Sequence, residues 1–416
     1  MAVVNATAPG WARLSPALRS RNFRLFWLGQ LISVIGTSVQ VVAEGWLIYD
    51  ITGSTFWLGM VGLLGLLPVL PFSLVGGLII DRVPRRKLLL ATQAGLMLQA
   101  TIFGLLAYSG QLVLWHIIVL YFVFGALLAI DHPARRAFLV ELVSKDDLAN
   151  AVALNATVFN LSSLIGFALA GFMLAALGAG ATMLFNAATY LAPISMLWLI
   201  RVRDVGADLP PAEGDKKPVQ GALLEGLREL LRQPELLVAI SIMAVAGGLS
   251  YPVFGLMAAF AEEVLQTDEI GLGVLMSAGA LGSVIGTFIV ARVGNHQRGQ
   301  TLALVAILLP ITVAIFASVR SLWLSCVILI LIGTALLIVQ SLAITLVQVR
   351  IADRVRGRVM SIYSLLHAGS DTMGNVAVGA VAVWLGLPLS LAVGALLALA
   401  YVVILALSFP AVRQLD

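Results

Sequence analysis

The chain has 416 residues, of which 60% are hydrophobic and only 11% are charged. Soluble domains carry roughly 25% charged residues, so this composition excludes an ordinary soluble protein and indicates a membrane protein with many spans. The formal net charge is a modest +4, and the single cysteine, Cys326, excludes an internal disulfide or a cysteine-rich metal site.

The first helices are predicted from the spacing of the charges. Residues 1–24 contain arginines but no apolar stretch followed by a small-residue cleavage site, so we expect no removable signal peptide. Beyond them, uncharged stretches of about 20 residues are long enough to cross a hydrocarbon core of roughly 30 Å. Six such helices are predicted in residues 25–200, covering 25–49, 56–80, two parts of 88–130 separated at "YSGQ" (108–111), and two parts of 148–200 separated at "LGAG" (177–180).

Residues 201–235 hold Pro210, Pro211, Pro218 and many charges that a bilayer core would not accept, so we expect a polar linker there. Six more helices are predicted in residues 236–410, before a short tail at 411–416. They cover 236–261, 270–291, 300–319, 321–349, and two parts of 359–410 separated at "LGLP" (385–388). The predicted fold is an all-α membrane protein with twelve transmembrane helices in two six-helix bundles.

The basic residues predict the orientation. If residues 1–24 are cytoplasmic, all 25 Lys and Arg residues except Arg320 fall in cytoplasmic segments. Positive residues flanking spans are retained in the cytoplasm, so both termini are expected there, in a multi-pass protein of the cell inner membrane. The excess of basic residues is then a topology signal, and no nucleic-acid partner is expected.

The two predicted bundles share a pattern of small and basic residues. "GFALAG" (166–171) and "GNVAVG" (374–379) have glycines at the same spacing and lie 208 residues apart, while Arg82 and Arg292 end similar helices 210 residues apart. Each match alone is weak, because small residues are common where membrane helices pack. Together with the layout of six helices, linker and six helices, they indicate a duplicated unit and pseudo-symmetric bundles.

The stretch "GGLIIDRVPRRKLLL" (76–90) places five charges between the second and third helices. In it Gly77 precedes Asp81 and Arg82, and a basic pair, Arg85 and Arg86, follows. With this spacing the chain resembles the major facilitator superfamily, although Pro84 stands where that family usually has glycine. The resemblance covers about residues 15–412 and is strongest to bacterial exporters similar to the enterobactin exporter, through "RNFRLFWLGQLIS" (21–33), "WLIYDITGS" (46–54) and "DHPARRAFLVELV" (131–143).

The resemblance implies a conformational latch between the bundles on the cytoplasmic side, formed by Gly77, Asp81, Arg82, Arg85 and Arg86. An acid at a helix end can contact the positive N-terminus of a neighbouring helix and an arginine, here Arg135 or Arg136. Ala291 aligns with Asp81 in the second bundle, so the latch is expected to be asymmetric. For Lys87, setting the topology is the simpler interpretation.

Asp131 and Arg135 follow the fourth predicted helix and form a second cytoplasmic cluster, which we assign to the same latch. A solvated loop is the alternative interpretation.

Asp371 and Glu44 are the two acids inside predicted spans. An intramembrane acid is a candidate functional residue, because burying its charge costs roughly 2.5 to 3.5 kcal/mol on insertion scales. Asp371 lies about 20 Å beyond Arg358 at 1.5 Å per residue, near the midplane, and His367 shares its helical face. This pair either binds and releases a proton or permanently fixes helix packing.

Glu44 lies near the outer end of the first helix. It either takes part in proton coupling or extends to the membrane interface with little effect on function. In drug exporters of the family that this chain resembles, acids of the first helix often carry protons or bind cationic substrates.

"GFALAG" resembles the antiporter motif of the family, with Gly166 and Gly171 at matching positions but without the proline of that motif. Close packing of helices explains the two glycines equally well. The motif therefore favours export over import only weakly.

In this fold the first, fourth, seventh and tenth helices line a central cavity. We expect the substrate cavity to include Gln40, Tyr121, Tyr251, Gln340 and Asn375. Aromatic and amide groups without basic residues suit a bulky amphipathic solute better than a sugar phosphate.

An ATP-driven pump would need G-x-x-x-x-G-K-[ST], and no glycine of this chain precedes a lysine. No catalytic, cofactor or metal site is predicted, so we do not expect an enzyme. The hypothesis is a monomeric secondary transporter, a proton-coupled exporter of an amphipathic drug or siderophore-like solute. An uptake symporter and a non-transporting scaffold or sensor remain alternatives.

Overall fold

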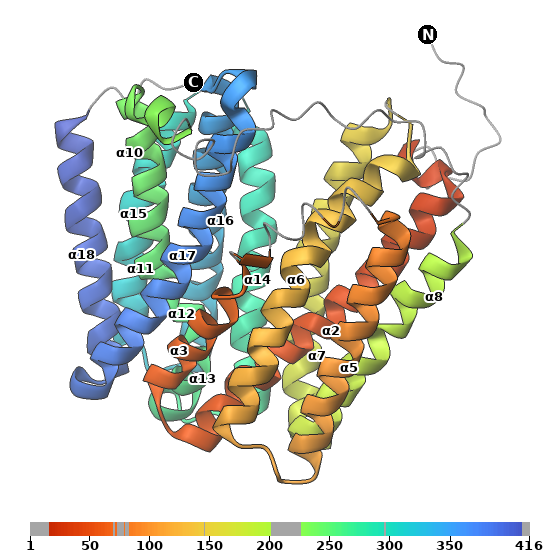
Figure 1. Cartoon of the computed structure of the whole chain (residues 1–416). Coiled ribbons are helices and arrows are strands. Elements are labelled where there is room, and N and C mark those ends of the chain that lie inside the picture. Colours follow the sequence, from red (N-terminus) through yellow and green to blue (C-terminus); the bar gives the residue numbers. More distant parts are fainter. Residues whose placement is uncertain are drawn as a thin grey trace.

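A computed structural model describes residues 16–69, 71–72, 79, 83–144, 146–200, 226–294 and 297–409, and these residues form helices joined by short turns. The expected latch residues Gly77, Asp81 and Arg82 and most of the expected linker lie outside the described residues. Figure 1 shows two groups of long helices side by side, with α2 beginning and α18 ending at the same end of the molecule. We call this end the terminal face and the other end the opposite face.

The first bundle begins with a short turn of helix, η1 (Pro16–Arg19). Its long helices are α2 (Arg21–Thr52), α3 (Thr55–Leu66), α5 (Arg85–Tyr108), α6 (Leu114–Leu142), α7 (Leu148–Thr189) and α8 (Leu191–Leu199). Gly178 interrupts α7 with a φ of 74°, within the predicted "LGAG" break, so α7 and α8 together make two crossings.

The seventh crossing, the first of the second bundle, is segmented. It contains α10 (Pro234–Ile242), η3 (Met243–Gly247), α11 (Gly248–Ser250), α12 (Pro252–Gly255), α13 (Met257–Ala259) and η4 (Phe260–Val264), of which η3 and η4 are π-helical turns. The remaining helices are α14 (Glu269–Val293), α15 (Arg298–Ser318), α16 (Leu322–Arg350), α17 (Asp353–Leu385) and α18 (Leu387–Ser408).

Local signals explain several of these helix ends. The Ser20 hydroxyl accepts a hydrogen bond from the Phe23 N–H at the start of α2, and Asp268 caps Gly271 at the start of α14 in the same way. Gly53 and Gly386 follow α2 and α17 with φ of 56° and 77°, a backbone conformation in which a side chain would be strained.

Nine helices of the described part of the chain are long and apolar enough to cross a membrane. One of the nine, Leu148–Leu199, contains two crossings. Neither α3, which has 12 described residues, nor the more polar α17 belongs to the nine, and each adds one crossing. The fold is thus the predicted all-α membrane fold with twelve crossings.

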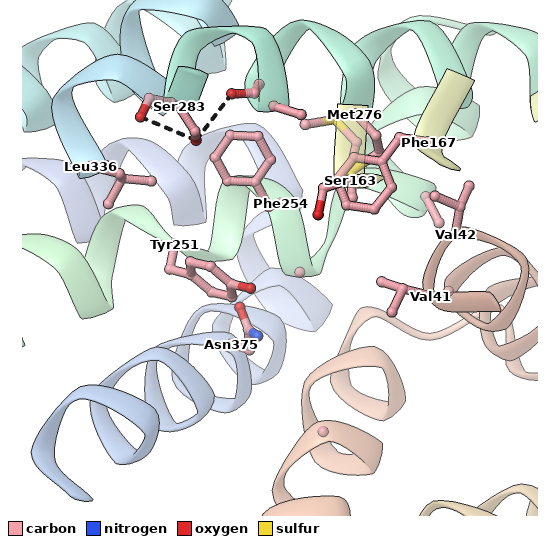
Figure 2. A pocket seen from close by; sticks show the side chains of 18 of the residues that line it. Val41, Val42, Ser163, Phe167, Tyr251, Phe254, Met276, Ser283, Leu336 and Asn375 are labelled. Atoms are coloured by element: carbon pink, nitrogen blue, oxygen red, sulfur yellow. Dashed lines mark hydrogen bonds between the residues drawn. The ribbon is translucent and has the colours of Figure 1, made fainter. Parts of the chain in front are cut away.

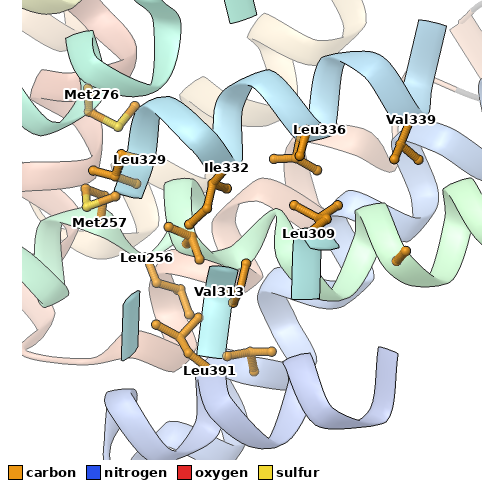
Figure 3. Packing of buried hydrophobic residues seen from close by; sticks show 14 of the residues in the cluster. Leu256, Met257, Met276, Leu309, Val313, Leu329, Ile332, Leu336, Val339 and Leu391 are labelled. Carbon is orange, nitrogen blue, oxygen red and sulfur yellow. The ribbon is translucent and has the colours of Figure 1, made fainter. Parts of the chain in front are cut away.

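The interior of the second bundle is apolar. Leu309 and Val313 of α15 pack against Ile332 and Leu336 of α16, and Leu391 of α18 closes the same cluster (Figure 3). Phe260 and Phe316 stack with ring centroids 4.4 Å apart. Such packing fixes the second bundle through van der Waals contact.

The repeated glycines make equivalent contacts in the two bundles. Within each bundle, Gly166 of α7 packs on Ser38 of α2, and Gly374 of α17 packs on Gly248 of α11. Across the bundles, a Cβ added to Gly171 would lie 2.5 Å from the Glu269 carbonyl oxygen, and one added to Gly379 would lie 2.5 Å from that of Thr55. The bundles therefore meet through two related helix pairs, α7 with α14 and α17 with α3.

A central cavity and its neighbouring carboxylates

A cavity of about 370 Å³ lies between the two bundles. Figure 2 shows Val41, Val42 and Phe167 of the first bundle across from Phe254 and Leu336 of the second. Four of the five expected lining residues border this cavity: Tyr121, Tyr251, Gln340 and Asn375. Helices α3, α7 and α14 also contribute lining residues, which the sequence did not predict.

The cavity wall is mainly apolar, with a few convergent polar groups. The described lining residues include no charged side chain, and their polar members include Asn160 and Ser163 of α7 and Ser283 of α14. The Asn160 amide donates across the bundles to the Thr287 hydroxyl at 3.5 Å. Such a wall suits a largely apolar solute that offers a few hydrogen-bonding groups.

Gln40 differs from the expectation, because it is fully buried and is not a lining residue. Adjacent residues of a helix point about 100° apart, so Val41 and Val42 face the cavity while Gln40 faces the interior of the first bundle. The Gln40 Nε2 donates to Glu44 Oε1 at 2.6 Å.

Glu44 is 2% exposed, so it does not extend to the membrane interface. Tyr121 of α6 lies within electrostatic reach of the Glu44 carboxylate. Glu44 is not a lining residue, whereas Tyr121 is.

Two residues that the sequence reasoning missed complete this buried network. The Asn186 Nδ2 of α7 donates to Gln40 Oε1, and the Thr189 hydroxyl donates to the Asn186 backbone carbonyl at 2.7 Å. Both side chains pack against α2 at Gly36, which has no Cβ to displace them. An Asn and a Thr three residues apart in an apolar helix were the available sequence signal.

Asp371 and His367 lie one helical turn apart on α17, with His367 Nδ1 3.4 Å from Asp371 Oδ2. The Asp371 side chain is 13% exposed, so it is more accessible than Glu44. Neither Asp371 nor His367 is a lining residue, but Asn375, one further turn along α17, is. Tyr251 of the cavity wall lies within electrostatic reach of the Asp371 carboxylate.

The solvated-loop interpretation of Asp131 and Arg135 is wrong, because α6 continues through both residues to Leu142. Asp131 is 0% exposed and forms an ion pair with Arg135. It accepts hydrogen bonds of 2.7 Å from the Thr92 hydroxyl and from Gln93 Nε2, both on α5. Apolar residues such as Phe138 and Leu142 hold this end of α6 against the bundle, which explains why the helix does not end at the charges.

Arg85 and Arg86, the other basic latch residues that the structure describes, bond within the first bundle. Arg85 pairs with Glu141 of α6. Arg86 donates to the carbonyl oxygens of Leu197 and Trp198 at 2.8 and 3.0 Å, so it caps the C-terminus of α8.

Two helical bundles that enclose a cavity at their interface, with a carboxylate behind or beside the cavity wall in each bundle, define a membrane transporter of the alternating-access class. Residues 11–416 match the transmembrane secretion effector family. The chain belongs to this family of major facilitator transporters, as its motifs predicted, and it is a multi-pass membrane transporter and not an enzyme.

Curated relatives are similar along most of the chain. The chain is 25% identical to the multidrug efflux pump Tap of Mycolicibacterium fortuitum over 410 residues, which cover 94% of this chain and 96% of Tap. It is 26% identical to the enterobactin exporter EntS of Salmonella typhi over 367 residues, which cover 86% and 84% of the two chains.

Among solved structures, a bacterial homolog of the human lysosomal transporter Spinster, in an inward-facing and occupied conformation, superposes with a TM-score of 0.70. The match covers 96% of this chain and 97% of that one at 14% identity. At this identity the likeness establishes the fold.

Proposed function

We propose that this chain is a proton-coupled exporter that moves a bulky amphipathic solute out of a bacterial cell by alternating access. The observation that carries the proposal is the mainly apolar cavity, which has no charged side chain among its described lining residues and a nearby carboxylate in each bundle. Relatives named as a multidrug efflux pump and an enterobactin exporter support the export direction.

In this proposal Glu44 and Asp371 with His367 are the proton-coupling groups. A buried carboxylate is costly when charged and cheap when protonated, so gaining or losing a proton changes which arrangement of the bundles is favoured. A gradient can then drive the rocking of one bundle against the other. Helices of both bundles of one chain line the cavity, which supports a monomer as the working unit.

The proposed orientation places the terminal face in the cytoplasm and the protein in the inner membrane. The placement of nearly all basic residues on that side supports it. A fluorescent protein fused after Asp416 should fluoresce in the cytoplasm, whereas a periplasmic reporter at that position should stay inactive. The reverse result would exclude this orientation.

The latch also remains part of the proposal, with Gly77, Asp81, Arg82, Arg85, Arg86, Asp131 and Arg135 as its members. We propose that the bonds of Arg85 and Arg86 within the first bundle belong to the state in which the latch is open. Closing it would require Arg85 or Arg86 to exchange these partners for groups of the second bundle.

The test of function is transport in everted membrane vesicles that are energised by a proton gradient. Antibiotics, dyes and siderophores are added one at a time to the outside of the vesicles. We expect gradient-dependent accumulation of at least one amphipathic solute, reduced about tenfold or more by Asp371→Asn. The exposed Asp50, at the end of α2, provides a matched control, and Asp50→Asn should transport normally. Flux in the other direction would indicate an uptake symporter, and the absence of flux for every solute would indicate a scaffold or sensor.

A further inference from the structure

We propose that the end of α8 at the terminal face binds the headgroup of an anionic phospholipid, such as phosphatidylglycerol, through Arg21 and Arg86. This site is distinct from the central cavity, and it depends neither on proton coupling nor on the direction of transport. Because Arg86 is also a proposed latch member, the site belongs to the arrangement of the bundles that the structure shows.

The C-terminus of α8 lies on the membrane-facing perimeter of the protein. Figure 1 shows α8 at the outer edge of the first bundle, where it packs against α2 and α5. Its last residues include Trp198 and Leu199, whose side chains are 69% and 51% exposed. In a membrane protein such apolar side chains face lipid, and tryptophan is enriched where the hydrocarbon meets the headgroups. The end of α8 is therefore at the depth of the lipid headgroups.

Two guanidinium groups converge on this helix end. Arg86, at the start of α5, donates through Nε and Nη2 to the carbonyl oxygens of Leu197 and Trp198, and its Cζ lies 6.0 Å from the centroid of the Trp198 ring. Arg21, at the start of α2, donates through Nη1 to the Leu199 carbonyl oxygen at 3.3 Å. The fold thus gathers two positive charges from separate helices at the last turn of α8.

These two charges are not balanced by acids. Within the described residues no carboxylate forms an ion pair with Arg21 or Arg86, whereas the adjacent Arg85 pairs with Glu141 of α6. The negative end of the α8 dipole is equivalent to about half a charge, so more than one positive charge remains. Lys87, the next residue of α5, is exposed and adds to it. The helix end therefore attracts an anion.

The arginines also retain hydrogen-bonding capacity. A guanidinium group has five N–H donors, and the contacts with α8 use Nε and Nη2 of Arg86 and Nη1 of Arg21. The other nitrogens suit the oxygens of a phosphodiester, which arginine recognises better than lysine does. A phospholipid supplies this phosphate at the depth of the site, together with acyl chains that cover the exposed apolar side chains. A soluble anion supplies the phosphate alone.

The experiment measures lipid binding to the purified full-length protein by native mass spectrometry, with phosphatidylglycerol as the anionic lipid and phosphatidylcholine as the zwitterionic comparison. The unmodified protein should retain phosphatidylglycerol preferentially. Arg21→Gln and Arg86→Gln should each weaken the binding of phosphatidylglycerol about fivefold and leave that of phosphatidylcholine unchanged.

Arg232→Gln is the matched control. It removes one positive charge of the second bundle just before α10, where the arginine side chain is 75% exposed and lies 3.6 Å from Glu229. This variant should bind both lipids as the unmodified protein does. A loss of phosphatidylglycerol in Arg232→Gln equal to that in Arg86→Gln would overturn the proposal, because it would indicate attraction to the whole face. Equal retention of the two lipids by the unmodified protein would also overturn it.

A second measurement locates the lipid without any substitution. Phosphatidylglycerol that carries a photoreactive diazirine close to its headgroup should label the peptide of the unmodified protein that contains Trp198 and Leu199, and excess inorganic phosphate should not prevent the labelling. Labelling of other segments alone would overturn the site. Loss of labelling in phosphate would overturn the lipid as its occupant, since that would indicate a site for soluble anions. If an arginine variant does not fold, the position of the label decides.

Discussion

The two bundles share a scaffold but differ in their interiors. Gly166 and Gly374 make equivalent contacts within their bundles, and Gly171 and Gly379 make equivalent contacts between them. In the second bundle the buried polar side chains of the described residues are three serines, Ser250, Ser325 and Ser390. The first bundle instead buries a carboxylate in each of two networks, at Glu44 and at Asp131.

The two bundles thus share the places where helix backbones pack closely together. The side chains in their interiors differ. The second bundle carries its ionisable pair on α17, at the partly exposed His367 and Asp371, and packs its centre with apolar residues. The first bundle depends on hydrogen bonds that are costly to leave unsatisfied. Its stability should therefore be more sensitive to single polar substitutions.

The largest effect is expected at the buried ion pair of the first bundle, between Asp131 and Arg135. Arg135→Ala leaves Asp131 buried without its cation, and removing one partner of a buried pair costs about 3 to 5 kcal/mol. Arg350→Ala, in the second bundle, breaks a pair with Glu235 whose side chains are 38% and 42% exposed and should cost about 1 kcal/mol or less. Thermal unfolding of the purified variants in detergent compares the two.

A double variant, Asp131→Leu with Arg135→Met, removes both charges and should recover much of the lost stability. Equal losses in Arg135→Ala and Arg350→Ala would show that the first bundle is no more dependent on its polar interior than the second.

The shared scaffold is tested at the two interbundle glycines. Gly171→Ala and Gly379→Ala should each cost about 1 to 3 kcal/mol, because a Cβ at either position collides with a backbone carbonyl of the other bundle. The two losses should be similar. Gly357 of α17 has no neighbour within 4 Å of an added Cβ, so Gly357→Ala should be neutral or slightly stabilising.

Yields of folded protein and melting temperatures provide this measurement, and gradient-driven transport shows whether the interface still moves. If Gly171→Ala lost stability and Gly379→Ala did not, the two helix pairs would not contribute equally to the interface between the bundles.

Much of this scaffold follows from the sequence. Uncharged stretches predicted the crossings, and the glycine of "LGAG" falls at the interruption of α7. The spacing of the repeated glycines predicted the duplicated unit. It also allowed a packing role for these glycines, because helices that approach closely need a small residue at the contact.

The side-chain interior could not be predicted in the same way. When a helix is apolar on every face, its sequence does not show which face points into the cavity. Gln40 was therefore assigned to the cavity, although its neighbour Val41 lines it. For the same reason Asn186 gave no sign that it would meet Gln40 from a helix 146 residues away. Asp131 was misjudged because a charge was taken as the end of a membrane helix, whereas three polar partners bury it.

The smallest effect is expected at a hydrogen bond between the bundles, from Tyr49 to Glu263. At the opposite face the Tyr49 hydroxyl of α2 donates to Glu263 of η4, and the Thr55 hydroxyl donates to the Gly379 carbonyl at 3.0 Å. Both bonds join the bundles where α2 ends and α3 begins. Tyr49→Phe removes one bond and should shift the equilibrium by about 1 kcal/mol toward separation at this face.

Spin labels at Ile51 and Gln266, in a Cys326→Ala background, report the separation between the bundles at the opposite face. Double electron–electron resonance should show a larger population of long distances in Tyr49→Phe than in the parent, and Tyr401→Phe should match the parent. If the distribution does not change, the Tyr49 bond contributes nothing to closure, and the remaining contacts of α3 with α17 and of α7 with α14 hold this face closed.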